Sequence, residues 1–477
     1  MKTKLNILSE QEKTQVHEAS LEILETVGVR VKSELARSYF LEAGAHVEQE
    51  TNIVKLPRDL VEKCLRHAPK EFVLGARRPG WDLHLNGKDC WLMADGEAST
   101  IWEYETKTRR ATNFNDWLQV TRLLDMVDDV GVYWCMVEGG LGKESHVDHL
   151  KYWRQLFGNF SKHIQDPINH KDYAPWLLEV LQIVFGSKDE IKKKNPYSFL
   201  VCPQSPLIID EQYTDALLSL AGWGIPTAIM PMPLMGGTAP GTMISILVTG
   251  NCEVLAMLCL LQVVDPGWPV IYAPVLAAMN PRTGLYSSGT IDNALLSTAA
   301  IEMGHYYNLP VEGTGGGTDH FVPRVQAGYE RAMTAMMPIL AWPDLLVGCG
   351  LLGGSMVLSM EQLLIDAEIF RMSKHAAMGI DTSEEKWLMK SIQETGPGGH
   401  FLGRRSTVKA IRNGEWFHPK IGYHGTFEAW DLNDRPNLMD QAHAHVKEML
   451  ASHDPMPLPE DVERELSRLQ RHAEFEE

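Results

Sequence analysis

Two acidic side chains, Glu312 and Asp319, stand at the ends of a short stretch whose residue types could hold a ligand. The apolar run 309–311 leads directly into Glu312, which is typical of a buried strand that delivers a polar group at its carboxyl end. Because glycine lets the main chain approach a ligand closely, the glycines before Asp319 favour ligand contact about as much as a tight turn alone. These glycines are Gly315, Gly316 and Gly317.

A second acidic pair, Asp95 and Glu97, lies a few residues before the aromatic residues Trp102 and Tyr104. A quaternary ammonium group has no N–H to donate, so proteins hold it with aromatic ring faces and nearby negative charge. Carboxylates beside aromatic rings therefore indicate a site for such a cation. A β-hairpin with a solvated acidic turn explains the same residues equally well.

The segment 398–405 supplies groups of the opposite kind. His400 and Arg404 could bind a substrate carboxylate, which arginine grips with two parallel hydrogen bonds, and Phe401 lies between them. Arg405 is a weaker candidate, since exposed arginines usually belong to the surface.

A repeated order of elements must position these residues. Apolar strands lead into glycine-bearing loops and then into helices, which predicts a TIM (β/α)8 barrel with its site at the carboxyl ends of the strands. An open, doubly wound sheet is the alternative, because the pattern does not establish closure. The eight predicted strands are 130–136, 162–165, 198–202, 227–230, 270–273, the neighbourhood of 311, 345–348 and 398–402.

Flanking segments complete the predicted architecture. Residues 1–112 combine two helical patterns with short alternating segments and predict an N-terminal α+β cap. Residues 113–427 form the predicted barrel. Residues 428–477 are charged and helical, and predict a C-terminal helical extension that is solvated or serves for docking.

Composition narrows the class of partner. A net charge of −18 argues against nucleic acid. The apolar run 244–264 contains Asn251 and Glu253, so we expect a buried barrel helix and no membrane contact.

The N-terminus and the cysteines indicate the compartment. No signal peptide is expected before Glu10, and seven cysteines without a CxxC pair fit a reducing cytoplasm. We expect no metal site, because the candidate histidines are scattered: His163, His305, His320, His400 and His424.

Several longer motifs, in order along the chain, resemble the trimethylamine methyltransferase family. They span nearly the whole sequence: 233–240, 251–256, 315–319 with 326–330, 396–402 and 428–430. The resemblance implies a TIM-barrel enzyme that moves a methyl group from a methylamine to the cobalt of a separate corrinoid protein.

This chain departs from the founding members of that family, which carry pyrrolysine inside the barrel. It contains only ordinary residues, and the corresponding position is expected near 349–356. The resemblance therefore points to the non-pyrrolysine branch, whose members demethylate quaternary amines such as glycine betaine, proline betaine or carnitine. Glycine betaine is the favoured substrate, and the nucleophile is supplied by the corrinoid.

The resemblance also suggests roles for the candidate residues. A cation would be surrounded by Glu312, Asp95, Glu97, Tyr104 and Phe401, and a carboxylate would be bound by His400 and Arg404. The mouth where the corrinoid enters would be lined by Thr238, Asp319, Gly315, Gly316 and Gly317. No DxHxxG motif for the lower cobalt ligand occurs, so the corrinoid (cobalamin) is expected on a cognate partner protein.

Two other functions remain open at this stage. One is a non-catalytic barrel protein that binds or senses a methylated amine. The other is a zinc-dependent methyltransferase, which would carry stoichiometric zinc. A homo-oligomer is also open, because apolar barrels of this size often pair.

Overall fold

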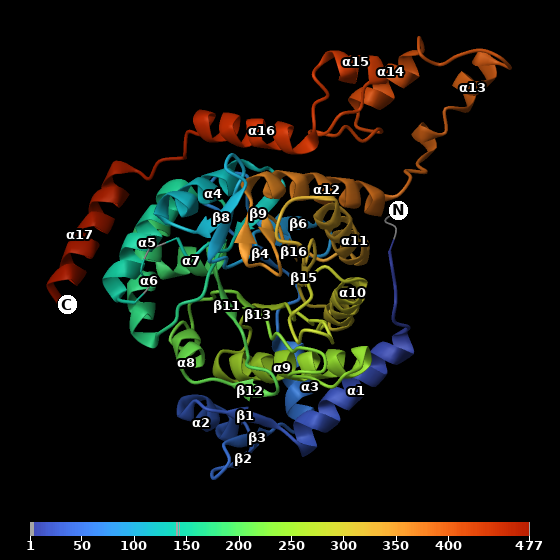
Figure 1. The fold of residues 1–477 in the computed structure, drawn as a ribbon. Coiled ribbons are helices and arrows are strands. Elements are labelled where there is room, and N and C mark those ends of the chain that lie inside the picture. Colours follow the sequence, from blue (N-terminus) through green and yellow to red (C-terminus); the bar gives the residue numbers. More distant parts are fainter. Residues whose placement is uncertain (1–3, 140–141, 143, 477) are drawn as a thin grey trace.

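Eight parallel strands form a ring at the centre of the protein (Figure 1). The structure is a computed structural model that describes residues 4–139, 142 and 144–476. A parallel bridge between Tyr272 and Val311 joins the two edge strands and closes the ring. In order around the barrel the strands are β6 (Trp91–Met93), β9 (Val130–Tyr133), β10 (His163–Gln165), β11 (Tyr197–Val201), β13 (Thr227–Ile229), β14 (Val270–Tyr272), β15 (Glu312–Thr314) and β16 (Leu345–Val347).

The TIM barrel is thus confirmed, and seven of the predicted strands take part in it. The prediction of an eighth strand at 398–402 was wrong, because that segment forms turns and bends. Its place is taken by β6, which pairs with β9 and β16 although it lies in the predicted cap. The three-part division at residues 112 and 427 stays a prediction, with β6 drawn from the first part into the barrel sheet.

Helices surround the barrel. Helix α10 packs on α11 and α11 on α12. Helix α9 is the one described helix long and apolar enough to cross a membrane, and 83% of its most apolar window is buried inside the protein. The helices are α4 (Phe114–Met126), α5 (His146–Asn159), α6 (Ala174–Phe185), α7 (Lys188–Lys194), α8 (Gln212–Leu218), α9 (Met243–Val264), α10 (Ile291–Tyr306), α11 (Val325–Ala341), α12 (Met360–Met378) and the short 3-10 helix η1 (Lys171–Tyr173).

The N-terminal segments cover α9 from outside. Helix α1 (Glu10–Thr26) begins with a capping box between Ser9 and Glu12, and it packs on α9 together with α3 (Arg58–His67). Helix α2 (Glu34–Glu42) completes this layer. Beside it lies a small sheet in the order β12 (Ile208–Ile209), β1 (Val29–Val31), β3 (Ile53–Lys55) and β2 (His46–Glu48).

Two further small sheets border the barrel. Strands β4 (Phe72–Leu74) and β5 (Leu83–Leu85) form a hairpin. The other sheet joins the segment that follows β6 to the loop that follows β16. Its strands are β17 (Leu351–Leu352), β18 (Val357–Leu358), β7 (Thr100–Glu103) and β8 (Thr108–Ala111).

The C-terminal part leaves the barrel after α12 and returns to it. Residues 379–437, which we call the arm, stand away from the body (Figure 1). Their helices are η2 (Glu384–Lys386), α13 (Met389–Thr395), α14 (Arg405–Arg412) and α15 (Phe427–Leu432). The chain then packs α16 (Leu438–Ser452) on α12 and α4, and α17 (Glu460–Glu476) on α5 and α6.

Candidate functional site

A cavity of about 390 Å³ opens among the loops that follow the barrel strands at their carboxyl ends. This is the end at which TIM barrels carry their sites. Most of its exposed lining is apolar or formed by small residues. It is lined by Asp95, Gly96, Trp134, Met230, Met232, Leu234, Val275, Ala277, Tyr286, Ser288, Asn293, Ala294, Thr314, Gly315, Gly317, Thr334, Val347, Gly348, Gly354 and Ser355.

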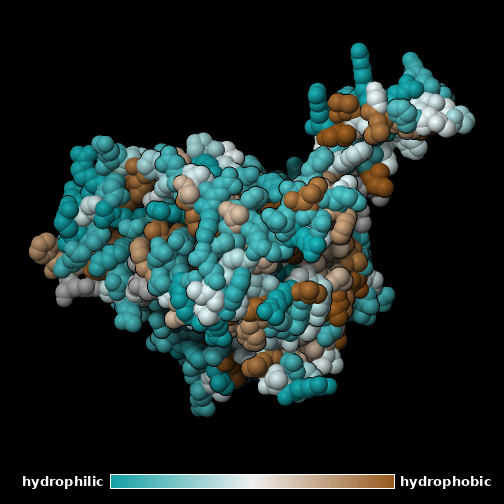
Figure 2. Space-filling model, turned by 45° about the horizontal axis from the view of Figure 1, so that its top comes forward, coloured by the Kyte–Doolittle hydropathy of each residue, from teal (hydrophilic) through white to brown (hydrophobic). Residues whose placement is uncertain are grey.

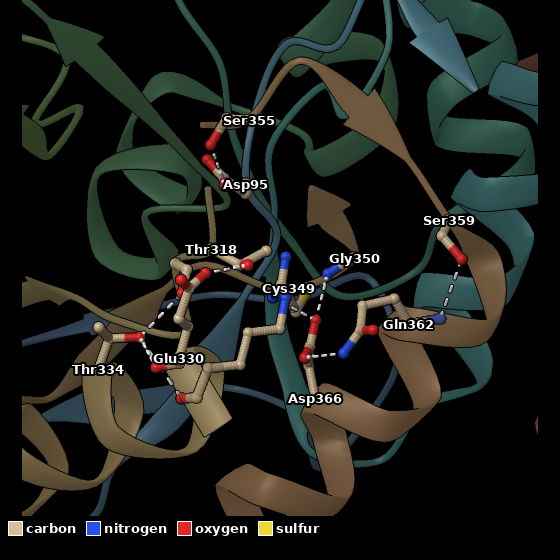
Figure 3. A network of polar contacts seen from close by, with 12 residues as sticks. Asp95, Thr318, Glu330, Thr334, Cys349, Gly350, Ser355, Ser359, Gln362 and Asp366 are labelled. Carbon is tan, nitrogen blue, oxygen red and sulfur yellow. Dashed lines mark hydrogen bonds and ion pairs between the residues drawn. The ribbon is translucent and has the colours of Figure 1, made fainter. Parts of the chain in front are cut away.

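Asp95 is the acidic residue of this lining, and it lies two residues beyond the end of β6. Ser355 Oγ donates a hydrogen bond of 2.7 Å to Asp95 Oδ2 (Figure 3), and the Gly96 N–H donates one of 3.0 Å to Oδ1. Burial raises the pKa of Asp95, although these hydrogen bonds and the charge of Arg331 act in the opposite direction. A cation in the cavity would favour the ionised carboxylate.

Two aromatic rings accompany Asp95. A Cβ at Gly96 would lie 2.8 Å from Cε2 of Trp134, so the indole packs against the residue that follows Asp95. Tyr286, which is 39% exposed, lies across from Gly354, and desolvation of its phenol raises the pKa, with the charges of Asp95 and Asp319 adding to the rise. One carboxylate therefore shares the cavity with an indole and a phenol, the groups that attract a permanently charged nitrogen.

Glu312 lies deeper in the barrel, two residues before Thr314 on β15. Gln165 Nε2 donates a hydrogen bond of 3.0 Å to its Oε2, while Oε1 has no hydrogen-bond partner among the described residues. Burial raises the pKa of Glu312 to about 7, and the bond from Gln165 opposes the rise. Near neutral pH this carboxyl can therefore hold or release a proton beneath the cavity.

The hydrogen-bond chain continues across the barrel interior from Gln165. Ser198 Oγ lies 3.1 Å from Gln165 Oε1 and 2.8 Å from Nε2 of His163. Burial lowers the pKa of His163 to about 4, so its imidazole is neutral at physiological pH. The barrel floor thus holds polar groups that carry no fixed positive charge.

The predicted glycine run brings two strands together. A Cβ at Gly348 would lie 1.7 Å from the Gly315 carbonyl oxygen, and one at Gly316 would lie 2.5 Å from that of Gly348. Gly348 also has φ +131°, a conformation that side chains disfavour. These glycines therefore serve the close approach of the β15 and β16 loops, while Gly315 and Gly317 still line the cavity.

Asp319 holds two loops together at the cavity. Its Oδ2 accepts a hydrogen bond of 3.0 Å from Ser287 Oγ, and its Oδ1 accepts one of 3.1 Å from the Gly289 N–H. Glu330 supports the same turn, since its Oε2 accepts hydrogen bonds from Thr318 Oγ1 and the Asp319 N–H. The loop after β15 is therefore tied both to the loop after β14 and to α11.

A buried ion pair supports the loop after β16 from below (Figure 3). Arg331 Nη1 lies 2.5 Å from Asp366 Oδ2, and both side chains are buried. Asp366 also accepts hydrogen bonds from the Gly350 N–H at 2.7 Å and from Gln362 Nε2 at 2.8 Å. Burial raises the pKa of Asp366 to about 6, against the opposing charge of Arg331.

Several predicted site residues lie elsewhere. Glu97 and Thr238 are exposed and do not line the cavity. Tyr104 contacts α16, where its hydroxyl bonds to Asp440 and its ring lies 4.4 Å from that of His443. The arm carries the remaining three, His400, Phe401 and Arg404, away from the barrel of their own chain. Their roles, like those of the residues that do reach the cavity, stay predictions.

The prediction from sequence missed most of the cavity lining, including Trp134, Tyr286, Asn293 and Ser355. Trp134 follows directly after β9, so an aromatic residue at a strand end was the available signal. Tyr286 and Ser355 come from loops, and Asn293 from the first turn of α10, and none of the three has a comparable sequence signal. Among the described residues no group of three or more His, Cys, Asp or Glu is placed to hold a metal ion, and the expectation of no metal stays a prediction.

Comparison with known proteins places the chain in a family. The sequence model of the trimethylamine methyltransferase (MTTB) family matches residues 1–476. The chain is 29% identical to the trimethylamine methyltransferase MttB of Desulfitobacterium hafniense, over 98% of this chain and 94% of that protein. It is 30% identical to a glycine betaine methyltransferase of Desulfitobacterium hafniense, over 97% and 96%.

A solved structure shares the fold. The monomethylamine methyltransferase MtmB of Methanosarcina barkeri matches with a TM-score of 0.51 and 12% identity, over 92% of each chain. At that identity the likeness concerns the fold alone. With a family match over almost its whole length, this chain belongs to the trimethylamine methyltransferase family.

Proposed function

We propose that this protein is a corrinoid-dependent methyltransferase that takes a methyl group from a quaternary amine, with glycine betaine as the favoured substrate. The acceptor is Co(I) of a corrinoid on a separate cognate protein, and the product is a tertiary amine such as dimethylglycine. The observation that carries the proposal is the combination of Asp95, Trp134 and Tyr286 in one apolar cavity.

The charge of the cavity suits a permanent cation. Among the described residues, neither lysine, arginine nor histidine belongs to its lining, so a positive nitrogen meets no like charge from them. Asp95 supplies the opposite charge, and ring faces attract a cation without needing an N–H. The cavity volume of about 390 Å³ is within the range of small-molecule sites.

The proposed chemistry asks little of the protein's own acids and bases. A quaternary nitrogen leaves as a neutral amine when one methyl departs, so no proton has to be delivered to it. The corrinoid supplies the nucleophile. The task of the cavity residues is to hold one methyl toward the mouth and to exclude water from the reacting groups.

Relatives in the family support this substrate class. One is named a glycine betaine methyltransferase and others are named trimethylamine methyltransferases. We place the reaction in the cytoplasm, since all seven cysteines are free thiols and a reducing compartment preserves such thiols.

A demethylation screen tests the proposal. Purified protein is mixed with cob(I)alamin, or with a reduced corrinoid protein, and with single N-methylated amines, and the change in corrinoid absorbance is followed. Methyl transfer from glycine betaine, proline betaine or carnitine supports the proposal. Binding of these amines without transfer would instead identify a non-catalytic amine sensor, and the absence of both would refute a methylated-amine function.

A further inference from the structure

Helix α11 has an outer face without a single charged side chain. Its two charged residues, Glu330 and Arg331, are both buried. The outer face instead exposes Val325 (86%), Tyr329 (59%) and Met333 (48%), followed by Met336, at the spacing of one helix face. A surface helix normally places charged residues toward water, so this face is typical of a contact surface.

This face reaches the cavity mouth. The first turn of α11 follows the loop that lines the cavity, and exposed Phe321 in that loop extends the apolar surface. Ile291 and Tyr286, on the neighbouring α10 side, are also exposed, and Tyr286 lines the cavity itself. Figure 2 shows hydrophobic residues along this side of the body, where Figure 1 places α10 and α11.

The arm also has an exposed apolar surface. Trp387 and Trp416 are 61% and 52% exposed, and they border a groove of about 530 Å³ together with Ile392 and Phe401. Figure 2 shows hydrophobic residues on the projecting arm as well. Exposed tryptophans on a segment that stands away from its own barrel are typical of a surface that is covered in an assembly.

Charge identifies what covers the arm. Within the arm, residues 386–420, which include Trp387, Trp416, His400 and Arg404, carry seven Lys and Arg against two Asp and Glu, a net charge of +5. The flanking residues 379–385 and 421–437 carry −5, so the arm as a whole is neutral and the rest of the chain carries the total of −18. The basic, aromatic central part of the arm is complementary to an acidic body, and a second copy of this chain offers such a body together with the uncharged face of α11.

We propose that the arm of one copy packs across α11 of a second copy and brings His400 and Arg404 to the mouth of that copy's cavity. Among the described residues the His400 side chain makes no hydrogen bond or ion pair, and Arg404 contacts only Glu394, at 3.3 Å. No cationic residue lines the cavity in the part of the chain that the structure describes, so none there receives a carboxylate. The neighbour's arm supplies that residue, since arginine binds carboxylates in a two-pronged geometry.

The assembly is tested first by mass. Sedimentation velocity of the full-length protein is expected to show a dimer or larger ring, and Met333→Glu is expected to release monomers. Leu41→Glu, which changes an equally exposed apolar residue on α2, is the matched control and keeps the assembly. Tyr329→Lys repeats the test if Met333→Glu does not fold, as judged by circular dichroism. A monomeric wild type, or α11 variants with unchanged mass, would overturn the proposal.

The role of the arm at the neighbour's site rests on the proposed function and is tested by ligand binding. His400→Ala combined with Arg404→Ala is expected to weaken glycine betaine binding by about tenfold or more, while tetramethylammonium, which has no carboxylate, binds as before. Equal losses for both ligands, or no loss for either, would refute the carboxylate role. If neither ligand binds the wild type, the proposed function fails while the mass measurement still decides the assembly.

Co-expression decides whether the arm acts on its own site or on a neighbour's. Asp95→Asn chains and arm-variant chains are combined in one assembly. If each site takes its arm from a neighbour, about a quarter of the sites join an intact cavity to an intact arm and recover glycine betaine binding. Recovery supports action on the neighbour, and its absence in verified mixed assemblies contradicts it.

Discussion

The surroundings of Asp95 determine what its carboxylate can do. It lies at the end of a buried strand, beside the indole of Trp134, and burial raises its pKa even though Ser355 and the Gly96 N–H hydrogen-bond to it. The hydrogen bonds from the protein offset only part of the desolvation cost of this carboxylate, so a ligand cation stabilises its ionised form strongly. This makes Asp95 the residue whose charge matters most for substrate binding.

Replacing Asp95 with asparagine removes that charge while keeping the shape. We expect affinity for tetramethylammonium to fall by about tenfold or more, a loss of roughly 1–2 kcal/mol. The melting temperature should not fall, because the carboxylate is a desolvated group that costs stability in the empty protein. Calorimetric titration of Asp95→Asn and wild type measures the difference, and Glu97→Gln, at an exposed acidic residue outside the cavity, is the control. An equal loss of tetramethylammonium affinity in both variants would contradict a role of the Asp95 charge in binding the cation.

Glu312 predicts a pH dependence of stability. Its pKa rises from an ordinary value of 4.5 to about 7 on folding, so the folded protein binds a proton that the unfolded chain releases. Stability from this group is therefore present below pH 4.5 and is lost as pH rises toward 7, by up to about 3 kcal/mol. Glu312→Gln should lose less stability than wild type between pH 5 and pH 8, as measured by urea unfolding. Parallel pH profiles for the two proteins would contradict this account of Glu312.

At the scale of elements, the loops after β15 and β16 depend on glycine for their approach. Gly348→Ala would place a methyl group 1.7 Å from the Gly315 carbonyl oxygen at a φ of +131°. We expect a loss of stability above about 4 kcal/mol or a failure to fold. Gly158→Ala is the matched control, since nothing lies within 4 Å of its Cβ position on α5, and it should gain up to about 1 kcal/mol. Thermal unfolding of both variants provides the comparison.

The ion pair between Arg331 and Asp366, beneath the loop after β16, should also contribute to stability. Arg331→Met leaves Asp366 buried without its cation and should cost about 3–5 kcal/mol. The pKa of Asp366, already about 6, should rise further, so the cost should be smaller at pH 5, where the carboxyl is protonated, than at pH 8. Adding Asp366→Leu should recover much of the stability. A cost that is independent of pH would show that the charge of Asp366 is not its source.

The barrel strands and the site residues that they carry show which parts of the structure could be predicted from the sequence. Most of the seven predicted barrel strands follow or form an apolar run that leads into a polar or glycine-bearing loop, whereas β10, with the sequence His-Ile-Gln, contains a single apolar residue. Strand β6 has the same local pattern as the short strands around it, and only its pairing with β9 and β16 assigns it to the barrel. Glu312 and Asp95 could be identified as chemical groups near strand ends. Tyr286 and Ser355 could not, because barrel closure brings their loops to the cavity.

At the scale of the whole molecule, an acidic body holds an apolar cavity and projects an arm whose central part, residues 386–420, is basic. The acidic body sets the charge complementarity that we propose for assembly. The cavity sets the ligand, because the carboxylate and the two rings favour a charged nitrogen over a neutral group of the same size. The proposed function depends on this preference for charge.

Isothermal titration with an uncharged isostere measures that preference most directly. Glycine betaine and 3,3-dimethylbutanoate share their shape and carboxylate, and differ in having nitrogen or carbon at the centre of the three methyl groups. If the cavity recognises a cation, glycine betaine binds the full-length protein at least about tenfold more tightly. Equal affinities, or tighter binding of the carbon compound, would contradict the account.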